Sequence, residues 1–143
     1  MAKPQQHASH EVQGKETLCT AIDDFIEERI HMAIKGIVHY ALDKIEENDV
    51  ILTYGYNDVI MNLCTTAQVK FTVVIIDSRP TFSGRKLLSK LTTAGISCTY
   101  GGIHACAYMM KSVTKVFLGA SAFMSNGAAR APIGTVGILS FYK

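Results

Sequence analysis

The sequence feature that most constrains the fold is the run "FTVVII" at residues 71–76. It is rich in β-branched residues and has no polar alternation, which is typical of a strand buried on both faces of a parallel sheet. Asp77, Ser78, Arg79 and Pro80 follow at once. Because ligands bind beyond the carboxyl ends of the strands in such sheets, an acid and a base at this position indicate a possible site.

The segments on either side of this run alternate between strand and helix. Strands are predicted at residues 50–54, 71–76, 96–100 and 115–119. Helices are predicted at residues 58–67, 84–94 and 104–111, and Pro132 is expected to start a last one. Strands and helices that alternate at this spacing predict an α/β domain, with a parallel sheet and flanking helices.

The N-terminal part has a different pattern. Residues 1–16 are polar and are expected to be disordered. Apolar residues then recur every three or four positions from Leu18 to Ile45, which predicts one long amphipathic helix that ends near Glu47. The predicted organisation is therefore a polar tail and helical arm at residues 1–48, followed by an α/β domain at residues 49–143.

Composition and charge exclude several classes of protein. A net charge of +2 without a basic stripe argues against binding to nucleic acid or an anionic membrane. The N-terminus lacks the apolar core of a signal peptide, and no apolar run is long enough to span a bilayer. The four cysteines form no C-x-x-C pair, and His31 and His39 have no third ligand nearby, so no metal and no cofactor are expected. The predicted location is the cytosol.

The loops after the strands form the candidate site. Gly55-Tyr56-Asn57, Asp77-Ser78-Arg79-Pro80, Tyr100-Gly101-Gly102 and Gly119-Ala120-Ser121 should face one crevice. Arg79, with Arg85 and Lys86 near the next helix start, can hold a phosphate. Asp77 can accept hydrogen bonds from the hydroxyls of a ribose. Alternatively it has a structural role, in which it caps the turn or pairs with Arg79 to hold the loop. The sequence contains neither the G-x-G-x-x-G motif of dinucleotide-binding domains nor a P-loop motif.

Several segments together resemble one family. The stretches "VILTYG", "VVIIDSRP", "GISCTYGGIHACAYMMKSVTKVFLGASAFMSNGAA" and "IGT" are similar to the regulatory alpha/beta/delta family of eukaryotic translation initiation factor 2B, with the delta branch nearest. The resemblance covers about residues 21–135. It implies a helical N-terminal region joined to a Rossmann-like domain, and it places Asn126 in a motif that shapes the crevice wall.

The resemblance also bears on catalysis. Related sugar-phosphate isomerases carry a cysteine at the end of the strand matching "ILTYGY" and an aspartate in a "GAD" motif matching "GAS". This chain has Gly55 and Ser121 there, and a glycine cannot exchange the proton that isomerisation requires. No catalytic residue and no enzyme activity are therefore expected. The candidate ligand-binding residues are Gly55, Asp77, Ser78, Arg79, Arg85, Ser121 and Asn126.

The resemblance implies a non-catalytic, delta-like subunit of the initiation factor 2B guanine-nucleotide exchange complex, which contributes to assembly and to regulation of translation initiation. The expected partners are the other subunits and initiation factor 2, with a sugar phosphate or nucleotide as the candidate small-molecule ligand. The alternatives are a sugar-phosphate isomerase relative and a sugar-phosphate or nucleotide-binding module.

Two departures from the family follow from the same comparison. Ala131-Pro132 stands before "IGT", where the family carries polar or basic residues, which argues against a phosphate-binding role there. The chain is also shorter than family members at both ends, so we expect a truncated, incomplete Rossmann-like sheet with an open edge, and self-association of the isolated chain.

Overall fold

The computed structural model describes residues 5–142, and the side chains from Gly14 onward. The chain divides between His39 and Tyr40 into two compact units. Among the described residues, no helix is both long enough and apolar enough to cross a membrane.

The N-terminal unit is helical from its first described residue. Helix α1 (Gln5–Phe25) continues into a π-helical segment (Ile26–His31) and then into α2 (Met32–Leu42). The predicted disorder of residues 1–16 is therefore wrong from Gln5 onward, because glutamine, alanine, glutamate and lysine in this segment favour a helix; residues 1–4 lie outside the described part. In the π-helical segment, His31 Nδ1 lies 2.6 Å from Glu27 Oε2.

The helix also ends earlier than predicted, at Leu42 rather than near Glu47. The Asp49 carboxylate accepts a hydrogen bond from the Glu46 backbone N–H at 2.7 Å. Ile45 is buried in the turn that follows the helix. These two contacts stabilise a turn where the apolar periodicity alone would continue the helix.

The C-terminal unit is built on a four-stranded sheet, in which every neighbouring pair is parallel. The strands are β1 (Val50–Tyr54), β2 (Thr72–Asp77), β3 (Ser97–Gly102) and β4 (Lys115–Val116), in the order β3-β2-β1-β4. The predicted parallel sheet is confirmed. Strand β3 runs two residues further than predicted because Gly101 and Gly102 pair with Ile76 and Asp77. Strand β4 is shorter than the predicted 115–119.

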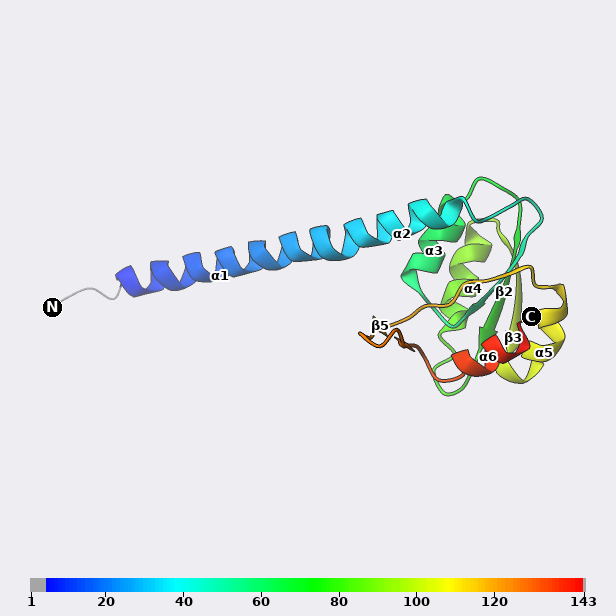
Figure 1. Cartoon of the computed structure of the whole chain (residues 1–143). Coiled ribbons are helices and arrows are strands. Elements are labelled where there is room, and N and C mark those ends of the chain that lie inside the picture. Colours follow the sequence, from blue (N-terminus) through cyan, green and yellow to red (C-terminus); the bar gives the residue numbers. More distant parts are fainter. Residues whose placement is uncertain (1–4, 143) are drawn as a thin grey trace. The chain divides into compact units, whose positions relative to one another are not determined.

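Helices cover both faces of this sheet (Figure 1). Helices α3 (Asp58–Thr66) and α4 (Gly84–Thr93) lie on one face. The other face carries α5 (Cys106–Met109), flanked by the 3-10 turns Ile103–Ala105 and Met110–Ser112, and α6 (Thr135–Phe141). The last helix starts at Thr135 rather than Pro132, because Gly134 adopts a left-handed conformation with φ of 103°.

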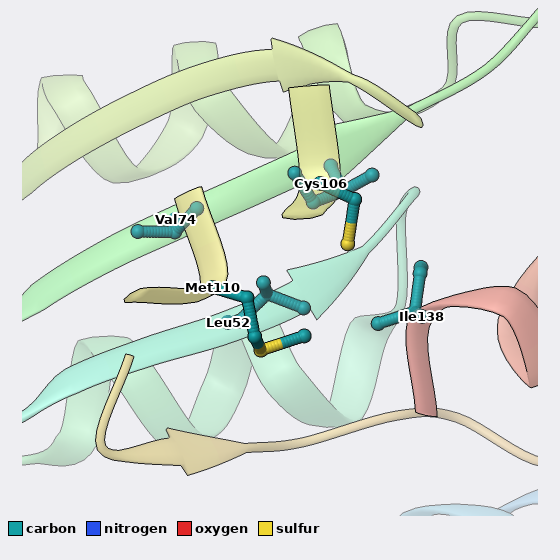
Figure 2. Packing of buried hydrophobic residues seen from close by; sticks show 6 residues of the cluster. Leu52, Val74, Cys106, Met110 and Ile138 are labelled. Carbon is teal, nitrogen blue, oxygen red and sulfur yellow. The ribbon is translucent and has the colours of Figure 1, made fainter. Parts of the chain in front are cut away.

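The core follows the alternation of β1 and β2. Leu52, Val74 and Ile76 pack with side chains from α5, the following turn and α6 (Figure 2). Their neighbours along the strands face the other way, where α3 and α4 contribute buried leucines; the members of this second layer are Ile51, Val73, Ile75, Leu63, Leu87 and Leu91. The run at residues 71–76 is thus the centre of the sheet, as its composition predicts.

A small antiparallel hairpin was not predicted. It consists of β5 (Ala122–Phe123) and β6 (Ala129–Arg130). Its turn contains Asn126 and Gly127, with Gly127 at φ of 81°. An Asn-Gly pair is the strongest short-range signal for a hairpin, so the sequence contained the information.

Candidate ligand crevice

Two adjoining cavities lie at the carboxyl ends of β1 and β2. Their volumes are about 260 Å³ and about 100 Å³. Tyr54, Tyr56 and Pro132 line both of them and so form the shared wall. The crevice expected at this edge of the sheet is therefore present, and Tyr54 and Pro132 are wall residues that the sequence analysis did not select.

The smaller cavity contains three of the predicted residues, which are Gly55, Asp77 and Ser78. Asp77 is 3% exposed. Its Oδ1 accepts the Ser78 backbone N–H at 2.9 Å, and its Oδ2 accepts the Tyr100 hydroxyl at 3.0 Å. The carboxylate thus caps the turn after β2, which is one of the two structural roles considered for it. The other role, an ion pair with Arg79, does not occur among the described residues.

A hydrogen-bonded relay joins the loop after β2 to the segment before α6. Ser78 Oγ lies 2.6 Å from the Tyr54 hydroxyl, which donates to the Ile133 carbonyl at 2.7 Å. Since the tyrosine proton is given to the carbonyl, Ser78 is the donor of the first bond. A Cβ on Gly134 would lie 2.9 Å from the same hydroxyl, so only glycine allows this close approach.

The larger cavity contains Ser121 together with Asn57, Gly119 and Thr135. The Ser121 hydroxyl donates to the Arg130 carbonyl at 3.0 Å. Asn57 caps α3, accepting the backbone N–H groups of Val59 and Ile60 at 2.8 and 3.3 Å. Thr135 is 5% exposed, and its hydroxyl has no hydrogen-bond partner within the protein. Among the described residues, the hydroxyls of Thr135 and Thr53 are the buried side-chain polar groups without a partner, and of these two residues Thr135 lines the cavity.

The remaining predicted residues lie outside both cavities. Arg79 and Arg85 are exposed and lie over the Phe82 ring, at 5.8 and 4.6 Å from its centre. Asn126 accepts the Ala128 backbone N–H at 3.0 Å and so holds the hairpin turn. Tyr100-Gly101-Gly102, expected as a crevice loop, belongs to β3, and Tyr100 reaches the site only through its hydroxyl on Asp77.

Gly55 and Ser121 occupy the two positions at which the resemblance to the isomerases would place an acid–base pair. Gly55 has φ of 65°, and a Cβ there would lie 3.0 Å from Ser83 Oγ. A cysteine at this position would therefore be strained in this backbone. Among the described residues, no three histidine, cysteine or acidic side chains are grouped so that they could hold a metal ion.

The fold and the crevice define a class: a Rossmann-like α/β domain with a partly polar crevice at the carboxyl ends of its strands. The chain belongs to the initiation factor 2 subunit family, whose model matches residues 1–140.

Individual relatives agree with this assignment. Subunit delta of translation initiation factor eIF2B from Schizosaccharomyces pombe is 47% identical over 127 residues, which is 86% of this chain and 27% of the relative. Its counterpart from Dictyostelium discoideum is 42% identical over 138 residues, or 94% of this chain and 22% of the relative. A chain of the tetrameric eIF2B beta2-delta2 complex from C. thermophilum has a TM-score of 0.79 and 30% identity, covering 92% of this chain and 43% of that one. The chain thus spans about a quarter of the length of the curated relatives it matches.

Proposed function

We propose that this chain acts as a non-catalytic, delta-like subunit of the translation initiation factor 2B complex, in the cytosol, and contributes to assembly and to regulation of translation initiation. The observation that carries the proposal is the 47% identity with a delta subunit, which extends over both the helical arm and the α/β domain. The lack of a catalytic pair at Gly55 and Ser121 supports a role without enzyme activity.

The exposed apolar side chains of the C-terminal unit support a role in assembly. Phe123 in the hairpin is 81% exposed, and Val136 on α6 is 80% exposed. Ile133, just before α6, and Val136, Leu139 and Phe141 on α6 are all exposed as well. Exposed apolar side chains that gather on one element in this way are typical of surfaces that other proteins cover. We expect the other subunits of the complex to cover these side chains.

Co-purification tests the proposal. The tagged chain is co-expressed with a beta subunit of initiation factor 2B, and we expect the two to elute together from affinity and size-exclusion columns. The double substitution Phe123→Ser and Val136→Ser should reduce co-purification. The matched control is Val69→Ser, which changes a 40% exposed valine at the opposite end of the sheet. Failure of the unmodified, folded chain to retain any other subunit would refute the proposal.

A second candidate function is binding of a sugar phosphate or nucleotide in the crevice, which the unpartnered hydroxyl of Thr135 favours. Calorimetry with ribose 5-phosphate and with adenosine monophosphate tests it. We expect binding that Thr135→Val weakens and that Thr65→Val, a change of an exposed threonine on α3, leaves unchanged. No measurable heat with either compound would exclude this candidate and would leave the first untouched.

A further inference from the structure

A group of cations and aromatic rings lies at the start of α4, outside the walls of the crevice except for Tyr56. We call it the basic-aromatic patch. Lys86 Nζ and Lys90 Nζ lie 4.5 and 5.3 Å from the centre of the Tyr56 ring, and Arg79 and Arg85 lie over the Phe82 ring. The patch consists of Tyr56, Arg79, Phe82, Arg85, Lys86 and Lys90. All four cations are exposed, and each contacts a ring face.

The charge of the patch is not neutralised by the protein. None of its four cations forms an ion pair with an acid among the described residues. Asp58 is the acid nearby, and it accepts the Tyr56 hydroxyl at 2.6 Å. Four cations and this one acid give +3, whereas the whole chain carries +2, so all other residues together carry −1. The positive charge of the chain is therefore concentrated on this patch.

This arrangement is unfavourable for the isolated helix. Arg85 and Lys86 stand in the first turn of α4, and that turn contains no acid. A helix N-terminus carries partial positive charge and prefers anions, so two cations there repel it. Phe82, whose ring both arginines contact, has φ of 45°, a conformation that non-glycine residues seldom adopt. An anion bound at this position would offset the repulsion between the two cations and the helix N-terminus, which has no such compensation in the free protein.

The geometry also selects the kind of anion. Stacking on a ring face occupies the flat side of a guanidinium and leaves its N–H edge free for a carboxylate, which it can bind with two hydrogen bonds. A guanidinium held over a ring has fewer conformations to lose on binding, and Arg85 lies the nearer of the two to the Phe82 ring, at 4.6 Å from its centre. The rings themselves already carry cations, and their faces are therefore less available for the base stacking by which single-stranded nucleic acid is bound.

We propose that the basic-aromatic patch is a docking site for an acidic segment of a partner protein, with Arg79 and Arg85 binding its carboxylates and Lys86 and Lys90 extending the contact along α4. The two lysines are four residues apart on α4, so they lie on one face of the helix with their Cβ atoms about 6 Å apart. Tyr56 receives a hydrogen bond from Lys90 at 2.9 Å, which raises the pKa of this lysine and keeps it charged. The inference does not depend on the proposed subunit function.

Fluorescence anisotropy with a labelled oligoglutamate peptide tests the proposal on the whole chain. We expect saturable binding that the double substitution Arg79→Gln and Arg85→Gln weakens by about tenfold or more, since each exposed charged pair contributes up to about 1 kcal/mol. The pair Lys86→Gln and Lys90→Gln should act in the same direction. Binding should also weaken as salt rises, because the charges are exposed to solvent.

The control is a double substitution that removes the same charge elsewhere, Lys44→Gln with Lys70→Gln, both exposed and distant from α4 in the sequence. It should leave the affinity within about twofold. Equal losses for the patch and control variants would show that only net charge matters and would overturn the proposal. The proposal would also be overturned if a labelled oligothymidine bound more tightly than the peptide. Displacement of the peptide by millimolar inorganic phosphate would overturn it as well. Circular dichroism of each variant verifies that the fold is retained.

Discussion

Asp49 is expected to contribute to stability through its charge. It is 7% exposed and lies at the opposite end of the sheet from the crevice. Its carboxylate accepts hydrogen bonds from Lys115 Nζ and from the Thr114 hydroxyl, both at 2.7 Å. The hydrogen bond from Lys115, followed by those from Thr114 and Glu46, lowers the pKa of Asp49 from 3.8 to about 2 despite its burial. This shift corresponds to about 2 kcal/mol of stability in the charged state.

The sign of the effect follows from the lowered pKa in the folded protein. The contribution is fully present above the unfolded value near 3.8 and is lost as the pH falls toward 2. Asp49→Asn should therefore reduce the free energy of unfolding by about 2 kcal/mol at neutral pH and by little near pH 2. Urea unfolding followed by circular dichroism at several pH values measures the difference between the two proteins.

The control for this experiment is Asp43→Asn, which removes the same charge from an exposed carboxylate. We expect this change to alter the free energy of unfolding by less than about 0.5 kcal/mol at every pH. The reasoning is refuted if Asp49→Asn and Asp43→Asn lower the free energy of unfolding equally at neutral pH. It is also refuted if the loss caused by Asp49→Asn stays constant between pH 4 and pH 2, since the pKa of about 2 requires it to diminish there.

Three further predictions concern the crevice. Gly84→Ala should destabilise the protein by about 1–3 kcal/mol in urea unfolding, because the new Cβ would lie 2.8 Å from the Asp77 carboxylate, whereas Gly137→Ala has open space and should be neutral or stabilising. Tyr54→Phe removes the relay between Ser78 and the segment before α6 and should cost about 1 kcal/mol, with faster proteolysis of that segment; an unchanged protease pattern would argue against the relay. The unmodified chain should not isomerise a pentose 1-phosphate, and turnover above background in a coupled assay would contradict the proposed non-catalytic role.

The sequence by itself determined the class of the fold. Residues 73–76 are buried on both faces of the sheet, because four consecutive branched apolar residues leave the strand without a polar side to expose. The helix predicted at residues 84–94 is present as α4, and Gly95, which follows it at φ of 78°, is the kind of residue that ends a helix. The motifs "DSRP", "FLGA" and "SNG" indicated one family from the sequence alone, and the family model and the similar relatives confirm that the chain belongs to it.

Tertiary structure decided which residues meet in the site. Asp77 and Arg79 are two positions apart, yet the first is buried against the Tyr100 hydroxyl and the second is exposed, with its guanidinium 5.8 Å from the centre of the Phe82 ring. No local pattern predicts this separation, because it depends on strand pairing and on a loop that brings Phe82 beneath two arginines. The same holds for Tyr54 and Ile133, which are distant in sequence and joined by one hydrogen bond. Short-range patterns record which residues are buried, whereas the direction of a polar side chain depends on partners that only the folded chain brings within reach.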